Sequence, residues 1–468
     1  MPSGNGWRCC RSRSKSARVF VRAIPTQDYR RTRIVASLTD PIAIGPLTVP
    51  NRLYRAPLLE CAGNGQRAVE RLIEELEPSA RSGVGLVFQG ASIVTAEGGC
   101  AAPNMTRVHD PDFVARLDRL TDAIHAHEGK IFLQLAHGGL RSMATWHAGY
   151  RERHPDERQL AVSRPPWQLQ ALDRLGLISL SPDVLSTADV YDLAGQFGRC
   201  AGHAIDAGYD GLHLSAANMS LLQQFLSPFY NRRDDEFADG VRFLEAIHDA
   251  VRDHAGDVPL VTKVPVETAT PSFVRRYITR NVGIRMAERL ADIGYDALVP
   301  VEVSVFWDMS IVRGAFPDRA WDAAALQEDY AAAFGGRWRA RGVRLLNRLQ
   351  ARRFDREPGW NADFCRAVRE RVDAPVLLEG GLRTRADCDR YLAGAAPAAD
   401  MVGMARPFYA EPRLGARLLA GADALCEHCN NCTVPQVTGE PGRCRTPSVV
   451  RQRARLERAG AYDERSSE

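Results

Sequence analysis

Between about residues 36 and 420 the chain alternates short apolar runs with longer amphipathic stretches, and this rhythm constrains the fold more than any other feature. Short apolar runs are typical of buried parallel strands, and apolar residues spaced three or four apart are typical of the helices that cover them. Runs of this kind occur near 53–57, 85–88, 130–135, 211–214, 260–264, 297–300, 375–379 and 400–403. Helical spacing occurs at 112–127, 188–207, 241–254, 284–293 and 361–371. The pattern predicts a (β/α)8 barrel, whose reactive groups lie at the carboxyl ends of its strands.

The domain organisation follows from composition. Apolar residues make up 45% of the 468 positions and are spread evenly, which suits one large core with appendages. We expect a basic, disordered N-terminal segment at 1–35, the barrel at 36–420 and a Cys-rich tail with a C-terminal helix at 421–468. The segments 266–283 and 303–358 are longer than ordinary connections, and such excursions usually cap an active site or contact another subunit.

The net charge of +4 is concentrated in the head, where residues 1–34 carry nine Lys or Arg and a single acid, Asp28. The remainder is slightly acidic, so the sequence gives no support for nucleic-acid binding. The Arg- and Ser-rich head superficially resembles an organelle transit peptide. We interpret it instead as a disordered tail, or as the result of a translation start predicted too far upstream. No run approaches the roughly 18 apolar residues of a membrane span. We therefore expect a soluble, cytoplasmic protein with no membrane partner.

Collinear motifs at the predicted strand ends carry a family resemblance. They occupy 41–45 with 51–58, 83–86 with 90–91, 132–139, 224–228 with 231–233, 379–382 and 402–407. Together they resemble the old yellow enzyme family of FMN-dependent oxidoreductases over roughly residues 38–448, nearest to the barrel domain of 2,4-dienoyl-CoA reductase and trimethylamine dehydrogenase. The resemblance implies FMN as cofactor, NADH or NADPH as reductant, and hydride transfer through flavin N5.

The candidate FMN residues follow several strands. Gly380-Gly381 and Ala405-Arg406 offer close-approaching backbone N–H groups and a guanidinium to a phosphate, after the last two strands. By resemblance, the amide of Gln134 both donates to and accepts from the polar edge of the isoalloxazine ring. The resemblance also assigns two further groups beside the ring. They are the backbone of Ala56, Pro57, Leu58 and Leu59, and the small residues Gly90 and Ala91.

Lys263 stands within a buried strand, where the family usually has Arg. A cation there would stabilise negative charge on the reduced flavin near N1. A buried Lys also needs a partner, because an unpaired buried charge is very costly. A flavin contact and a structural ion pair both remain open.

The substrate residues depart from the family. Ser215 and Asn218 stand where classical members place a His-His or His-Asn pair, and Ser220 stands where they have a Tyr proton donor. A serine hydroxyl is a poor general acid near neutral pH. Leu59 replaces the flavin-tuning Thr or Cys. We name Asn218, Ser215 and Ser220 as catalytic candidates of an atypical site for a small molecule such as an enone or amine.

Four cysteines cluster near the C-terminus with the spacing C-x2-C-x2-C-x11-C: Cys426, Cys429, Cys432 and Cys444. The segment resembles the iron–sulfur region that follows the barrel in trimethylamine dehydrogenase and 2,4-dienoyl-CoA reductase. A 4Fe-4S cluster, a zinc site and an unmetallated remnant all remain open. No Gly-x-Gly-x-x-Gly segment accompanies the cysteines, so a cluster would need an external electron-transfer partner.

The leading hypothesis is an FMN-dependent, NAD(P)H-linked oxidoreductase of the ene-reductase type, with homo-oligomerisation implied by resemblance only. The alternative is a catalytically weak flavoprotein that acts as a binding or electron-relay protein through the cluster. A third hypothesis, a barrel that binds no flavin, is motivated by Lys263 and by the short linker before residue 241.

Overall fold

Eight parallel strands form the centre of the computed structural model, which describes residues 36–463. They are β3 (Leu53–Arg55), β4 (Leu86–Ile93), β5 (Lys130–Ala136), β8 (Gly211–Leu214), β9 (Leu260–Val266), β10 (Ala297–Glu302), β11 (Leu377–Glu379) and β12 (Met401–Met404). Their order is β10-β9-β8-β5-β4-β3-β12-β11, and a bridge from Leu298 to Val376 closes the ring. The predicted (β/α)8 barrel is confirmed, with a strand at each of the eight expected positions.

Side chains of alternate strand residues fill the inside of the barrel. Phe88 packs edge to face there against Tyr54 and against Phe132, with ring centroids 5.5 Å apart in both contacts. Gly403 of β12 makes room for this packing, because a Cβ at that position would lie 2.1 Å from the Tyr54 ring. The opposite faces of the strands pack against the surrounding helices.

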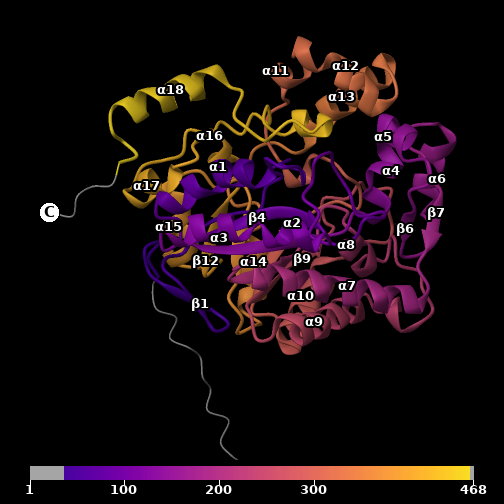
Figure 1. The fold of residues 1–468 in the computed structure, drawn as a ribbon, viewed down its shortest axis with the longest axis horizontal. Coiled ribbons are helices and arrows are strands. Elements are labelled where there is room, and N and C mark those ends of the chain that lie inside the picture. The colour runs from indigo at the N-terminus through magenta and orange to yellow at the C-terminus, as the bar shows by residue number, and fades with distance from the viewer. Residues whose placement is uncertain (1–35, 464–468) are drawn as a thin grey trace, which may run out of the picture. The chain divides into compact units, whose positions relative to one another are not determined.

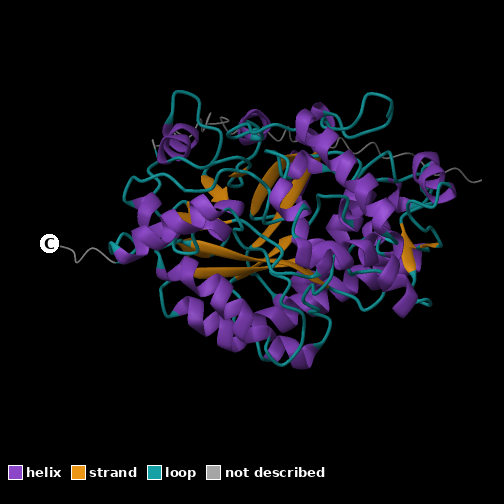
Figure 2. Ribbon diagram, turned by 90° about the horizontal axis from the view of Figure 1, so that it is seen from above, coloured by secondary structure: helices purple, strands orange, loops and turns teal. Residues whose placement is uncertain are grey.

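Helices surround the strands, as the view in Figure 2 shows. The covering helices are α1 (Ala68–Arg81), α3 (Asp118–His125), α7 (Thr187–Asp206), α9 (Val241–Ala255), α10 (Arg280–Ile293), α14 (Ala362–Arg369) and α15 (Arg385–Ala393). The prediction of a single helix at 112–127 is wrong, because the structure has two separate helices there, α2 (Pro111–Ala115) and α3. The N–H groups of Arg116 and Leu117 bond three residues back, to Phe113 and Val114, and these tighter bonds interrupt the helix.

Two excursions follow the carboxyl ends of β5 and β10, and Figure 1 shows them at the right and the upper right of the molecule. The first follows β5 and holds η1 (Gly139–Arg141), α4 (Met143–Trp146), α5 (Ala148–Arg153), β6 (Gln159–Ala161), α6 (Trp167–Arg174) and β7 (Pro182–Val184). The second follows β10 and holds η3 (Met309–Ile311), α11 (Asp318–Trp321), η4 (Ala324–Leu326), α12 (Gln327–Phe334) and α13 (Arg337–Arg353). Sequence reasoning anticipated the second excursion but missed the first, whose elements are too short to give a clear periodicity.

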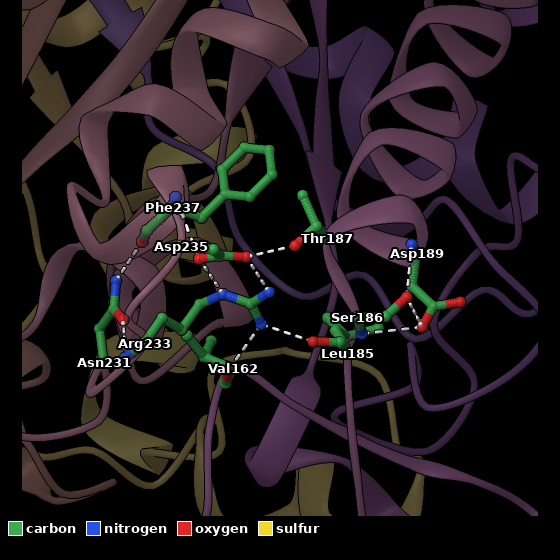
Figure 3. A network of polar contacts seen from close by, with 9 residues as sticks. All are labelled: Val162, Leu185, Ser186, Thr187, Asp189, Asn231, Arg233, Asp235 and Phe237. Atoms are coloured by element: carbon green, nitrogen blue, oxygen red, sulfur yellow. Dashed lines mark hydrogen bonds and ion pairs between the residues drawn. The ribbon is translucent and has the colours of Figure 1, made fainter.

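The Asn231-Arg232-Arg233 motif, which follows the barrel strand β8, is bonded to the first excursion through Arg233, as Figure 3 shows. Arg233 Nη1 donates to the carbonyls of Val162 and Leu185, and the guanidinium pairs with Asp235. Asn231 Nδ2 donates 2.8 Å bonds to the carbonyls of Phe225 and Phe237. The motif therefore has a structural role in the described part of the chain.

The C-terminal segment packs on the same unit, to which all the described residues belong. It contains α16 (Arg406–Ala410), α17 (Leu414–Leu419), η5 (Val434–Thr438) and α18 (Pro447–Arg458). The N-terminal hairpin β1 (Ile42–Ile44) and β2 (Leu47–Val49) precedes the first barrel strand. Among residues 36–463, no helix combines the length and apolarity needed to cross a membrane. The basic head expected at 1–35 lies outside the described residues.

Candidate active site

One large cavity of about 440 Å³ lies where the barrel strands end. This volume falls within the range of cofactor and small-molecule sites, about 300–1,000 Å³. Predicted cofactor residues on its lining are Pro57, Leu58, Leu59, Ala91, Gln134, Lys263, Gly380, Gly381, Ala405 and Arg406. The three catalytic candidates, Ser215, Asn218 and Ser220, also line it. The structure thus brings ten of the twelve predicted cofactor residues and all three catalytic candidates into one cavity.

Ala56 and Gly90 are not on this lining. Ala56 is buried, and its N–H donates to the Met404 carbonyl at 2.9 Å. A Cβ on Gly90 would lie 1.3 Å from the carbonyl oxygen of Leu58, in the loop after β3. Only glycine therefore fits at this position. The small size of Gly90 therefore accommodates the polypeptide chain beside it.

The amide of Gln134 is oriented by His213, a residue that sequence reasoning did not assign. Gln134 Nε2 lies 2.8 Å from His213 Nδ1 at the carboxyl ends of β5 and β8. Burial and the nearby charge of Lys263 hold the pKa of His213 well below its usual range, so the imidazole is neutral and can accept from the amide. A polar residue inside an otherwise apolar strand was the available signal.

Lys263 forms a buried ion pair and also lines the cavity. Its Nζ lies 2.6 Å from Glu379 Oε2, and both side chains are mostly buried. Glu379 Oε1 has no hydrogen-bond partner among the described residues. The structure thus contains the ion pair that the sequence left open, and Glu379, which the sequence placed in the 379–382 motif without a role, is a second site residue.

The turn after β11 needs both glycines. Gly380 and Gly381 have φ angles of 114° and 70°, in the region that glycine adopts most readily. A Cβ on Gly381 would lie 2.1 Å from the Glu357 carbonyl oxygen. These glycines therefore accommodate the neighbouring protein chain, and their backbone also lines the cavity, where its N–H groups are candidates for a phosphate.

Arg406 is held by groups from outside the barrel. Its guanidinium donates to the side chain of Asn430, to the Val312 carbonyl at 3.3 Å and to the Arg313 carbonyl at 2.9 Å. Asn430 belongs to the Cys-rich segment, whereas Val312 and Arg313 belong to the second excursion. The phosphate candidate is thus fixed in position by both appendages.

The residues at the substrate end form a tightly held turn. Asn218 and Met219 adopt left-handed φ angles of 60° and 59°. Gln223 Oε1 accepts from the Met219 N–H at 2.6 Å, and Gln224 Nε2 donates to the Met219 carbonyl at 2.8 Å. Strained backbone of this kind persists where the surroundings over-determine it and often marks functional sites.

The side-chain hydroxyl of Ser220 is used in hydrogen bonds that hold the fold. Its side chain caps the helix α8 (Leu221–Leu226) by accepting from the Gln223 N–H, and its hydroxyl donates to the Ser215 carbonyl. In Asn218 the bond is made by the backbone and not by the side chain: its backbone carbonyl accepts a 2.7 Å hydrogen bond from Arg141 Nη1. Sequence reasoning also missed Arg141, together with Trp146 and Trp307, which line the same cavity.

The four cysteines line a second, small cavity of about 20 Å³, next to His428. Cys429 Sγ lies 3.0 Å from Thr446 Oγ1. Burial raises the pKa of Cys426 to about 11 and also raises the pKa of Cys432 and Cys444. Within residues 36–463, no three His, Cys, Asp or Glu side chains are arranged to hold a metal ion. The donor set suits a metal, but the sulfurs are not at ligand spacing.

Comparison with known proteins identifies the family. The family model described as "NADH:flavin oxidoreductase / NADH oxidase family" matches residues 37–320, more than half of the chain. The chain belongs to this family. It is therefore an FMN-dependent, NAD(P)H-linked oxidoreductase, and the resemblance to old yellow enzyme is confirmed. The alternative of a relay protein without efficient catalysis is not favoured.

Several family relatives are similar over most of the chain. The "4,4'-dithiodibutanoate disulfide reductase" of Rhodococcus erythropolis is 26% identical over 90% of this chain and 98% of its own length. The "NADPH dehydrogenase" of Geobacillus thermodenitrificans is 26% identical over 74% of this chain and 98% of its own length. Among solved structures, a complex of 2-naphthoyl-CoA reductase has a TM-score of 0.65 at 16% identity. It matches 91% of this chain, which spans 58% of that longer protein.

Proposed function

We propose that the large cavity holds FMN and a small organic substrate together, and that the enzyme transfers hydride from NADH or NADPH to that substrate. When bound, FMN supplies a hydride acceptor and donor at N5. The observation that carries this proposal is the presence of ten predicted cofactor residues and all three predicted substrate residues on one lining. The donor set fits the group, because the backbone of Gly380-Gly381 and the cation of Arg406 lie on the cavity lining and suit a phosphate.

The protein side chains have separate roles in this proposal. Gln134, oriented by His213, binds the polar edge of the ring, and Lys263 supplies positive charge beside it. Asn218 and Ser215 donate hydrogen bonds to the substrate. Ser220 holds the turn through the Ser215 carbonyl and the cap of α8, so we assign it a positioning role.

Anaerobic purification tests the proposal. We expect a yellow protein that binds FMN stoichiometrically and whose flavin absorbance bleaches with NADH, NADPH or both. A colourless protein that cannot be reconstituted with FMN would overturn it. Bleaching by one nucleotide only would identify the preferred reductant.

We also propose that Cys426, Cys429, Cys432 and Cys444 hold a 4Fe-4S cluster in the mature protein. Four thiols on one cavity, with three of them within seven residues of sequence, support this proposal. The expected result is four iron and four acid-labile sulfide per chain, lost in Cys429→Ala. Stoichiometric zinc, or neither metal nor sulfide, would contradict it.

The location and partners belong to the same proposal. A cytoplasmic enzyme that acts on small molecules, as a homo-oligomer and with an external electron-transfer partner for the cluster, agrees with the resemblance. Analytical ultracentrifugation of the flavin-loaded protein measures the oligomeric state directly.

A further inference from the structure

Most charged side chains on the lining of the large cavity form an ion pair or several hydrogen bonds with the protein. Lys263 pairs with Glu379, and Glu302 pairs with Arg313 at 3.4 Å. Asp308 accepts from the Ser310 N–H at 2.9 Å. Arg406 donates to three uncharged acceptors and is already proposed for the phosphate. Arg141 is the second guanidinium on this lining, and it donates to a single acceptor.

Arg141 uses little of its hydrogen-bonding capacity. Nη1 donates to the Asn218 carbonyl, and the guanidinium carbon lies 4.8 Å from the centroid of the Trp307 ring. Nε is buried and has no partner. No carboxylate among residues 36–463 lies within ion-pair distance of this side chain. A guanidinium has five N–H donors, so most of them remain available to a ligand.

An unpaired cation in a closed environment favours an anionic ligand. Burial lowers the pKa of Arg141 to about 10, which leaves it charged at neutral pH. Burying a charge without a counter-ion is costly, and binding an anion relieves that cost. The planar fork of a guanidinium matches the two oxygens of a carboxylate.

The position of Arg141 assigns the anion to the substrate end of the cavity. Its bond to Asn218 places it beside the turn that carries Ser215 and Ser220. Trp146 and Trp307 lie against each other on the same lining, with ring centroids 5.1 Å apart. This end of the cavity therefore combines one cation with flat apolar surface.

We propose that Arg141 is the carboxylate-binding residue of the substrate site, and that the substrate is a small organic acid with an apolar or aromatic body. The proposal rests on the proposed function and deepens it. The same oxyanion chemistry is present in the pyrophosphate of a nicotinamide nucleotide, so the test has an arm for each source.

The first arm compares two probes that share an uncharged phenyl ring, benzoate, which carries a carboxylate, and benzamide, which does not. Their binding to the FMN-loaded protein is measured by calorimetry and by perturbation of the flavin spectrum. We expect benzoate to bind at least tenfold more tightly than benzamide. Arg141→Met should abolish this preference, and Arg141→Lys should retain part of it. Equal binding of the two probes by the unaltered protein, or a preference that survives Arg141→Met, would overturn the proposal.

The second arm compares flavin reduction by NADH with reduction by 1-benzyl-1,4-dihydronicotinamide, which has no phosphate. If Arg141 binds substrate, Arg141→Met changes both rates by the same small factor. A selective loss with NADH, together with unchanged benzoate binding, would assign the anion to the nucleotide and overturn the proposal.

Arg151→Met is the matched control. Arg151 is also partly buried and also donates to one carbonyl, that of Thr145 at 3.0 Å, but it does not line the cavity. We expect it to keep the benzoate preference. If the unaltered protein does not bind FMN, the proposed function is refuted. If it binds FMN and its flavin is reduced normally, but benzoate is not preferred over benzamide, only the role of Arg141 is refuted.

Discussion

At the scale of single residues, the cation beside the proposed flavin site does not act alone. Glu379 lies 2.6 Å from Lys263 and offsets its charge. A lone positive charge would favour the anionic reduced flavin and raise its midpoint potential, and a paired charge does so less. The potential therefore depends on both residues.

Glu379→Gln should raise the two-electron midpoint potential of the bound flavin. The amide keeps a hydrogen-bond acceptor for Lys263 but removes the negative charge. We expect a rise on the order of tens of millivolts, since about 30 mV corresponds to about 1.4 kcal/mol for a two-electron couple. Dye-equilibration titration measures it.

Glu357→Gln is the control, because Glu357 is an exposed carboxylate that pairs with Arg313 at 3.0 Å and does not line the cavity. It should leave the potential unchanged. An unchanged potential in Glu379→Gln would mean that the ion pair only stabilises the fold.

The sequence predicted much of the cavity lining at this scale because the FMN candidates occupy positions that match a family pattern. The site roles of Glu379, His213 and Arg141 were missed for physical reasons. Their roles depend on partners distant in the chain: Lys263 for Glu379, Gln134 for His213 and the Asn218 carbonyl for Arg141. No local sequence pattern indicates contacts between residues so distant in the chain.

At the scale of elements, the Leu226-Ser227-Pro228 part of the 224–228 family motif is explained by a buried carboxylate after β9. Glu267 accepts from Gln223 Nε2 at 3.0 Å, from Ser227 Oγ at 2.8 Å and from the Ile278 N–H at 2.8 Å. These bonds join α8 to the loop that precedes α10. Sequence reasoning found the motif but not its partner.

Glu267 should make stability depend on pH. Burial raises its pKa from 4.5 to about 7, against the opposing effect of its three donors. The folded state therefore binds the proton more strongly than the unfolded state, and the free energy of unfolding falls as pH rises from about 4.5 to about 7. The full effect is about 3 kcal/mol, from about 1.4 kcal/mol per pKa unit.

Glu267→Gln resembles the protonated carboxyl and should remove this part of the pH dependence. Urea denaturation at several pH values, read as the difference from the unaltered protein, measures it. Glu74→Gln, at an exposed position on α1, serves as the control. A slope between pH 4.5 and 7 that persists in Glu267→Gln would contradict the assignment.

At the scale of the whole molecule, the barrel, the second excursion and the Cys-rich segment meet at one residue. Asn430 is buried and left-handed, with φ of 59°. Its Oδ1 accepts from Arg406, and its Nδ2 donates to the carbonyls of Val312 at 2.8 Å and Ala315 at 3.2 Å. Sequence alone predicted the barrel and the Cys-rich tail, but their interlocking depends on this tertiary contact.

Asn430→Ala should loosen both the phosphate end of the cavity and the cysteine segment. Removing a buried amide with several bonds typically costs about 2–4 kcal/mol, because the carbonyls and Arg406 lose their partner. We expect weaker FMN binding and faster reaction of the cysteine thiols with a disulfide reagent, measured on the protein without added iron. Asn64→Ala is the matched control, since Asn64 makes its bonds of 2.7 and 3.0 Å to the Arg107 backbone, outside the Cys-rich segment; the thiols of Cys426, Cys429, Cys432 and Cys444 are followed individually by mass spectrometry. Comparable destabilisation in both variants, with faster thiol reaction only in Asn430→Ala, is the expected pattern. Equal thiol reactivity in the two variants would mean that the Cys-rich segment is held independently of Arg406.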